Sequence, residues 1–338
     1  MVIIMKESAT AEDIESVKQR IIELGCEPKV SEGDFCTILY STGGNFQPHT
    51  RSSMLAMKSV QEVILVSEPY QLVKRENKKG LTIVDVNGVK IGDKKITMMA
   101  GPCTVGRRDE LFLAAYAVKE AGADFLRGGT YKQKLDSDEL PGLGKECLQL
   151  LKEAKQETGL SVITEVRNHK EVELIGEYAD IIQISNLHMQ NFELLAAAAD
   201  YNKPVMLKRS MMASIKEWLM SAEYILKRGN PNVILCERGI RTFETYTEYT
   251  LDLSSVPVLK SITHLPVVVD PSHATGSRQF VPAMSKAAIA AGADGLLIEV
   301  HPNPPGARNC GYRFMELQSF KELMEDLKKV ARAVGREL

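Results

Sequence analysis

The chain has 338 residues, which is long for a single core and predicts one large domain with one small one. Its 42 lysine and arginine residues nearly balance 44 aspartate and glutamate residues, so no broad positive field is available to bind nucleic acid or an anionic membrane. Six cysteines without CxxC spacing argue against a disulfide framework. Without a basic, apolar leader or a run of membrane-spanning length, we expect a cytoplasmic protein.

The first 75 residues have the pattern of a small α+β sandwich. Apolar periodicity predicts strand, helix, strand, helix and strand in turn at residues 1–6, 11–24, 35–41, 53–58 and 60–70. In the first helix Thr10 and Asp13 have capping-box spacing, and Gly25 ends the helix. We therefore predict a first domain over residues 1–75.

Residues 76–94 are predicted to form a linker that ends in a β-hairpin. The charged stretch VKRENKKG is followed by TIVDVNGVKIGD, in which Asn87 and Gly88 lie between alternating apolar residues. Asn-Gly is the preferred sequence of a two-residue hairpin turn.

Residues 95–338 repeat one pattern, a short apolar run followed by a helical stretch. Eight runs fit it: ITMMAG, DFLRG, SVITEV, DIIQIS, PVMLK, NVILCERG, PVVVD and DGLLIEV. They are continuous rather than alternating, as expected of strands buried on both faces. The fold class is therefore α/β, with a (β/α)8 TIM barrel as the first choice and an open doubly wound sheet as the second. The repeated AGAD at Ala121 and Ala291 marks two equivalent corners between a helix and a strand.

Three residues that can bind a metal follow apolar runs far apart in the chain. They are Cys103, His273 and Glu299. Because parallel strands of a barrel present their C-terminal residues at one rim, these three side chains can converge on one ion.

Further charged residues follow the other strands, namely Arg127, Lys132, Glu165, Lys208, Arg209 and Arg238. Taken singly, each cation is better explained as a solvated loop residue, and Cys103 as a small buried residue. Together at one barrel mouth, they predict a pocket for a small substrate that carries phosphate and carboxylate groups.

Several strings resemble the 3-deoxy-D-arabino-heptulosonate 7-phosphate (DAHP) synthases. They are AGPCTV, FLRGGTYK, GLG, ITEV, DIIQIS, QNFELL, KPVMLKR, LCERGIRTFE, DPSHATG and IEVHPNP. The segment that ends in EPYQLVKRE is similar to the ferredoxin-like (ACT-like) regulatory domain of one branch of that family. The 3-deoxy-D-manno-octulosonate 8-phosphate synthases share the superfamily and usually lack this domain.

The resemblance implies condensation of phosphoenolpyruvate (PEP) with an aldose phosphate, erythrose 4-phosphate in that family, at the first step of the shikimate pathway. It also implies a divalent metal (Mn, Fe, Zn or Co) that polarises the aldehyde. Position for position, Cys103, His273 and Glu299 match the metal ligands. Lys208 and Arg238 match cations on the phosphate side.

The resemblance further assigns catalytic roles to Lys132, Glu165 and His273. Arg127 and Lys132 match the groups around the PEP carboxylate. Glu165 would orient or deprotonate the water that adds to PEP, with Lys132 as its proton partner.

Three loops depart from the family pattern. Where the family has Lys-Pro-Arg-Thr, this chain has Lys132, Gln133, Lys134 and Leu135, in which Lys134 can still meet a phosphate but lacks a bidentate fork. Leu187 takes the place of an arginine that grips the PEP phosphate, so His188 or Arg209 would have to compensate. Cys310 takes the place of an aspartate, the fourth metal ligand.

The departures leave several alternatives open. Either Cys310 packs as a small residue, or it makes a second thiolate ligand, a set that favours zinc or ferrous iron over manganese. The chain is then an ordinary DAHP synthase, a carbon-carbon bond-forming enzyme with a changed acceptor or donor, or a weakly active regulatory paralogue.

The first domain has two interpretations. It either senses an aromatic amino acid or docks protomers together. We expect a homotetramer or homodimer, with small anionic substrates and neither nucleic acid nor membrane as partners.

Overall fold

The structure is a computed structural model that describes residues 1–33, 36–42, 50–64, 69–130, 143–307 and 311–338. The chain divides into two compact units, Met1–Gln71 and Leu72–Leu338, which are described separately below. Among the described residues, none of the helices combines the length and the apolar content needed to cross a lipid bilayer.

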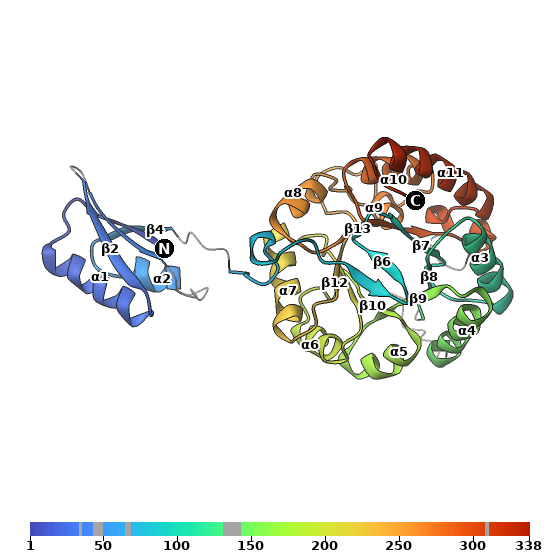
Figure 1. The fold of residues 1–338 in the computed structure, drawn as a ribbon, viewed down its shortest axis with the longest axis horizontal. Helices are drawn as coiled ribbons and strands as arrows, with labels where there is room; N and C mark the ends of the chain where they lie inside the picture. The colour runs from blue at the N-terminus through green and yellow to red at the C-terminus, as the bar shows by residue number, and fades with distance from the viewer. Residues whose placement is uncertain (34–35, 43–49, 65–68, 131–142, 308–310) are drawn as a thin grey trace. The chain divides into compact units, whose positions relative to one another are not determined.

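The first unit is a four-stranded antiparallel sheet with two helices (Figure 1). The strand order is β2-β3-β1-β4. The elements are β1 (Val2–Met5), α1 (Ala11–Glu23), β2 (Glu27–Glu32), β3 (Thr37–Thr42), α2 (Thr50–Leu55) and β4 (Val60–Ile64). The predicted α+β class is confirmed, but the prediction omitted β2, because its sequence EPKVSE has few apolar side chains.

The capping box predicted for α1 is present. The Thr10 hydroxyl accepts a hydrogen bond from the Asp13 backbone N–H at 3.2 Å, and the Asp13 carboxylate accepts one from the Thr10 N–H at 3.1 Å. Helix α1 packs Val17 and Ile21 against Ile3 and Leu39 of the sheet to form the core of this unit.

The second unit is a closed barrel of eight parallel strands, as predicted (Figure 1). The strands are β7 (Thr97–Gly101), β8 (Phe125–Arg127), β9 (Ser161–Val166), β10 (Ile181–Ile184), β11 (Val205–Lys208), β12 (Val233–Glu237), β13 (Val267–Val269) and β14 (Gly295–Glu299). Buried residues of all these strands are nearly continuous, because each strand has the barrel interior on one face and helices on the other.

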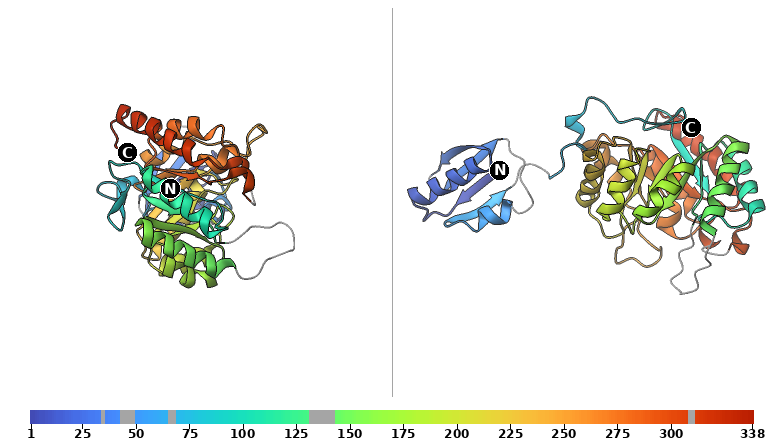
Figure 2. Two further views of the ribbon diagram at one scale, coloured as in Figure 1. Left: turned by 90° about the vertical axis from the view of Figure 1, so that its right-hand side faces the viewer. Right: turned by 90° about the horizontal axis from the view of Figure 1, so that it is seen from below.

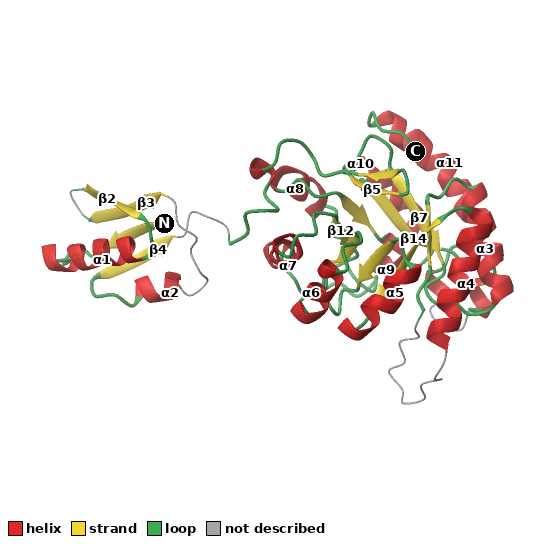
Figure 3. Cartoon of the chain, turned by 60° about the horizontal axis from the view of Figure 1, so that its bottom comes forward, coloured by secondary structure: helices red, strands yellow, loops and turns green. Residues whose placement is uncertain are grey.

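Helices surround the strands (Figures 2 and 3). They are α3 (Arg108–Glu120), α4 (Leu143–Thr158), α5 (Val172–Tyr178), α6 (Phe192–Asp200), α7 (Ile215–Lys227), α8 (Ser255–Ile262), α9 (Pro271–Thr275), α10 (Val281–Ala290) and α11 (Leu317–Ala333). Short 3-10 turns add η1 (Arg75–Asn77), η2 (His169–Glu171), η3 (Pro304–Gly306) and η4 (Gly311–Arg313).

The predicted hairpin is present as β5 (Val84–Val86) and β6 (Val89–Ile91), joined by Asn87 and Gly88, both at positive φ. Its apolar side chains belong to the same buried cluster as Met99, Phe125 and Ile163 inside the barrel. The hairpin therefore closes the end of the barrel where the strands begin, so a substrate site is left to the opposite end.

Candidate active site

Cys103, His273 and Glu299 converge at the carboxyl ends of the barrel strands. Cys103 follows β7, Glu299 ends β14, and His273 lies on α9, the short helix that follows β13. One ligand atom from each lies within 4.8 Å of the others. Residues separated by up to 196 positions in the sequence thus form one group that is capable of holding a metal ion.

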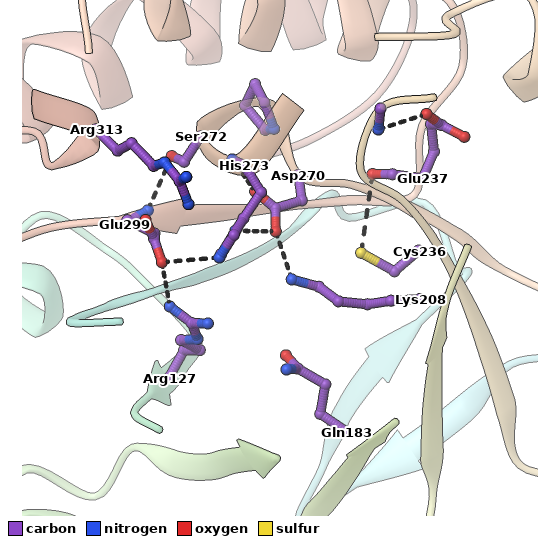
Figure 4. A network of polar contacts seen from close by, with 12 residues as sticks. Arg127, Gln183, Lys208, Cys236, Glu237, Asp270, Ser272, His273, Glu299 and Arg313 are labelled. Carbon is purple, nitrogen blue, oxygen red and sulfur yellow. Dashed lines mark hydrogen bonds and ion pairs between the residues drawn. The ribbon is translucent and has the colours of Figure 1, made fainter. Parts of the chain in front are cut away.

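Asp270 sets the orientation of the His273 ring. Asp270 is the N-cap of α9; its carboxylate accepts hydrogen bonds from the His273 backbone N–H at 3.0 Å and from Nδ1 at 2.7 Å. Nδ1 therefore carries the ring proton, and Nε2 points its lone pair toward Glu299 Oε1 at 3.1 Å (Figure 4). Burial lowers the pKa of His273 to about 4, against the opposing effect of Asp270 and Glu299, so the imidazole is neutral.

Glu299 is fully buried, and hydrogen bonds to Ser272 and Arg127 hold it. Its backbone N–H donates to Ser272 Oγ at 3.0 Å, and Arg127 donates to Oε1 at 2.6 Å. Burial raises the pKa of Glu299, but the neighbouring His273 ring and the Arg127 guanidinium lower the pKa overall. Oε2 is buried and has no hydrogen-bond partner.

This donor set fits a divalent cation. Two acceptor atoms, His273 Nε2 and Glu299 Oε1, face each other without a proton between them, and Glu299 Oε2 is unsatisfied. A bound cation would relieve both features, because it accepts lone pairs from all these atoms. A histidine that binds a metal through one ring nitrogen usually donates a hydrogen bond from the other nitrogen to a carboxylate or carbonyl, and Asp270 accepts that bond from His273.

Three cations at the strand ends, Arg127, Lys208 and Arg209, are each paired with a carboxylate. Arg127 contacts Glu299, and Lys208 donates to Asp270 at 2.6 Å (Figure 4). Burial would lower the pKa of Arg127, but Cys103, Glu299 and Asp270 raise it above its ordinary value.

Arg209 is held by protein groups at Nε and Nη1. Its guanidinium contacts Glu237 at 2.9 Å and Asp252 at 2.8 Å, and its Nε donates to the Ala213 carbonyl at 3.0 Å. Burial would lower the pKa of Arg209, but these two carboxylates raise it. In this arrangement Arg209 holds the loops that follow β11 and β12.

Arg238 differs from these cations because none of the carboxylates in the described residues contacts it. It follows β12, is 4% exposed, and its Nε and Nη1 have no hydrogen-bond partner. Its guanidinium carbon lies 4.2 Å from the ring centroid of Tyr249. A buried cation with free N–H donors is an attractive partner for a substrate anion.

Glu165 lies near the end of β9 and is held by a residue of the neighbouring strand. Gln183 on β10 donates from Nε2 to Glu165 Oε2 at 3.1 Å, and Gln183 Oε1 is buried without a partner. The sequence does not predict Gln183 or Ser272, and Asp270, which follows β13, is expected from the sequence only as one of the charged strand-end residues, without a role. Only Asp270 had a signal, its position three residues before His273 at a helix start.

Some predicted positions are not part of the described site. Lys132, Lys134 and Cys310 lie outside the described residues. Leu187, at the position where the family has an arginine, is 59% exposed, and the neighbouring His188 pairs its Nδ1 with Ser185 Oγ at 3.0 Å.

A closed barrel with charged side chains gathered at the carboxyl ends of its strands has the organisation of a barrel enzyme that acts on a small anionic substrate. Comparison with protein families specifies the class. Residues 73–334 match the DAHP synthetase I family, and residues 1–68 match the DAHP synthase ferredoxin-like domain. The chain belongs to the DAHP synthase family.

Individual relatives agree with this result. The chain is 42% identical over 335 residues to a phospho-2-dehydro-3-deoxyheptonate aldolase of Thermotoga maritima, with 99% of each chain covered. It is 30% identical over 258 residues to a 2-dehydro-3-deoxyphosphooctonate aldolase of Caulobacter vibrioides, covering 71% of this chain and 89% of that protein.

The fold agrees as well. The crystal structure of the Thermotoga maritima DAHP synthase superposes with a TM-score of 0.93 and 42% identity over 99% of this chain and 98% of that one. A truncated form of the Thermotoga enzyme has a TM-score of 0.74 over 79% of this chain and 98% of its own.

These findings confirm three predictions from the sequence: the family, the barrel with its small α+β domain, and an enzyme of the transferase type. The activity is the condensation of PEP with an aldose phosphate in aromatic biosynthesis.

Proposed function

We propose that this chain condenses PEP with erythrose 4-phosphate to give DAHP and inorganic phosphate. The observation that carries the proposal is the convergence of Cys103, His273 and Glu299 within 4.8 Å, in a barrel that belongs to this family. The remaining steps assign roles to the chain's own residues.

Cys103, His273 and Glu299 would hold a divalent metal, which when bound supplies Lewis-acid polarisation of the aldehyde oxygen. Asp270 keeps the His273 proton on Nδ1. Arg127 holds the Glu299 carboxylate, and Ser272 accepts a hydrogen bond from the Glu299 backbone N–H. Imidazole, thiolate and carboxylate together suit Zn or Fe, with Mn and Co as alternatives. Cys310 is proposed as a fourth ligand.

The cations would bind PEP. Arg238 is proposed to grip its phosphate, because its buried N–H groups are free to donate. Lys208 is proposed to assist at the phosphate, and Arg127 and Lys132 to contact the carboxylate. Lys134 is proposed to meet the phosphate of the aldose.

Glu165 is proposed to orient or deprotonate the water that adds to the phosphate-bearing carbon of PEP. Gln183 holds the carboxylate of Glu165 by its amide N–H, and its free Oε1 is available to accept a hydrogen bond from that water. The proton would pass through Lys132, and phosphate leaves with cleavage of the carbon-oxygen bond. Glu165→Gln should therefore lower turnover more than PEP affinity.

The ferredoxin-like unit is proposed to bind an aromatic amino acid as a feedback effector, with docking between protomers as the alternative. Activity measured across added tyrosine and phenylalanine tests the first role. A flat response would remove it.

One experiment tests the central proposal. The metal-free protein is reconstituted with Zn, Fe, Mn or Co in turn and incubated with PEP and either erythrose 4-phosphate or a five-carbon aldose phosphate, and phosphate release is followed. We expect metal-dependent release with erythrose 4-phosphate and none without an aldehyde. Release only with the five-carbon sugar, or release that does not depend on metal, would overturn the proposal.

Metal preference tests Cys310 separately. Cys310→Asp should shift the preference away from Zn or Fe toward Mn, because it replaces a thiolate by a carboxylate. An unchanged preference and affinity would remove Cys310 from the ligand set.

A further inference from the structure

Arg238 differs from the neighbouring cations in the kind of side chain that contacts it. Arg127, Lys208 and Arg209 each contact at least one carboxylate at 2.9 Å or less. Within the described part of the chain, the partner found for Arg238 is the aromatic face of Tyr249. A carboxylate would occupy N–H donors and cancel the charge, whereas a ring contacts only the flat face of the guanidinium.

Two backbone interactions hold Tyr249 against Arg238. Ile240 and Thr250 form an antiparallel bridge, which returns the loop after β12 to the residues that follow Arg238. The Tyr249 N–H donates to the Ala274 carbonyl of α9 at 2.8 Å. The ring position is therefore tied to the helix that carries His273.

Gly239 makes this close packing possible. Its φ is +95°, and a Cβ added there would lie 2.7 Å from Tyr249 Cβ and 3.0 Å from Ala274. A larger residue would push the loop away from Arg238, and its backbone conformation would also be strained.

The adjacent residue braces the same loop. Glu248 forms an ion pair with Arg313, whose side chain is 12% exposed, and so joins the loop after β12 to the turn η4 beyond β14. Glu248 and Tyr249 thus tie the loop to η4 and to α9.

We propose that Tyr249 is a positioning residue, which presents the edge of the Arg238 guanidinium to the phosphate of the substrate without neutralising it. This inference rests on the proposed role of Arg238 as a phosphate-binding cation. Ring contact fixes the plane of the guanidinium, and the unpartnered Nε and Nη1 remain as donors along its edge.

The test measures binding of inorganic phosphate to the full-length, metal-loaded protein by calorimetry, together with kcat and KM for PEP. Tyr249→Phe keeps the ring and should bind phosphate within about 2-fold of the unmodified protein. Tyr249→Leu should bind about 10-fold more weakly and raise the KM for PEP more than it lowers kcat. Tyr246→Leu is the matched control, since Tyr246 lies in the same loop but is 93% exposed.

A polyfluorinated phenylalanine at position 249 separates positioning from packing. It keeps the shape of the ring but removes the negative charge of its face, so it should weaken phosphate binding as Tyr249→Leu does. It also decides the question if Tyr249→Leu fails to fold. Phosphate binding by the fluorinated variant equal to that of Tyr249→Phe would overturn the inference.

Arg238→Met distinguishes failure of this inference from failure of the proposed function. If Arg238→Met binds phosphate as tightly as the unmodified protein, the phosphate role of Arg238 is wrong and the Tyr249 inference falls with it. If Arg238→Met loses binding while all variants at position 249 retain it, only the role of Tyr249 is wrong.

Discussion

The two ends of the barrel satisfy their charged groups in different ways. At the closed end, Asp124, Asp180 and Asp294 each lie one residue before a strand and repeat one arrangement. Each accepts the backbone N–H of a residue at the start of a neighbouring strand, Met98, Val162 or Val267, and each also contacts a lysine. Every one of these carboxylates is fully paired within the described structure of this end.

At the mouth, the pairing is incomplete. Glu299 Oε2, Gln183 Oε1 and two nitrogens of Arg238 are buried without partners, and His273 Nε2 faces a carboxylate oxygen. Such groups cost folding free energy, because each loses its hydration without gaining a hydrogen bond.

The difference indicates that the two ends have different roles: the closed end stabilises the barrel, and the mouth binds ligands. Complete local pairing at the closed end stabilises the fold, whereas unsatisfied donors and acceptors at the mouth are poised for an ion and an anionic substrate. Substitutions at the two ends should therefore separate stability from activity.

The largest effect is expected at the proposed metal ligands. Glu299→Gln should lower the rate of phosphate release by more than about 100-fold and reduce the bound metal, because an amide binds a divalent ion poorly. Metal analysis and turnover check it, with the exposed Glu316→Gln as a control. Full metal content with normal turnover would refute the assignment.

Arg238→Met should weaken substrate binding at the mouth and leave the stability of the fold nearly unchanged. Losing a charge-assisted contact of about 1.5 to 3 kcal/mol should weaken PEP binding by about 10- to 100-fold. The free energy of unfolding should not fall by more than about 1 kcal/mol, because the substitution removes a buried charge that has no carboxylate partner in the part of the chain that the structure describes. Urea unfolding checks this, and a loss above about 2 kcal/mol would show that Arg238 stabilises the fold.

Asp294→Ala tests the closed end. It removes contacts to the Val267 N–H, Lys260 and Arg336, so the free energy of unfolding should fall by about 2 to 4 kcal/mol. Turnover per folded molecule should stay within about 2-fold of normal. The exposed pair of Glu120 and Lys321 provides the control, since Glu120→Ala should leave the free energy of unfolding almost unchanged. A large loss of turnover without unfolding would contradict the comparison.

The smallest effect concerns pH. His264 near the closed end contacts the Leu72 carbonyl through Nε2 and the Thr82 hydroxyl through Nδ1, both at 2.7 Å, and burial lowers its pKa with help from Lys78 and Arg75. Because the unfolded chain then binds the proton more tightly, stability is complete above pH 6.5, the ordinary value, and declines as the pH falls toward the lowered pKa.

Thermal unfolding of the unmodified protein and His264→Gln between pH 7.5 and 5 checks this sign. The amide should retain part of the hydrogen bonding, at a cost of about 1 kcal/mol at neutral pH, and should lose less stability on acidification. If the stability of both proteins changes with pH by the same amount across this range, His264 does not titrate in it.

The sequence by itself determined the strand and helix order of the barrel, the capping box at Thr10 and Asp13, and the hairpin at Asn87 and Gly88. These features depend on local periodicity and turn chemistry. It also predicted that Cys103, His273 and Glu299 belong together, because barrel topology brings strand ends to one rim.

Only the tertiary structure decided how the charges at that rim are paired. Arg209 pairs with Glu237 at the end of β12 and with Asp252 in the loop after it, and the same loop brings the ring of Tyr249 against Arg238. Asp270 at the start of α9 fixes the His273 ring. Strand β2 forms through pairing with β3 rather than through its own apolar pattern. Periodicity places a residue at the end of a strand. It does not show which side chain from elsewhere in the fold contacts that residue. That contact decides whether a cation is neutralised or is free to bind a substrate.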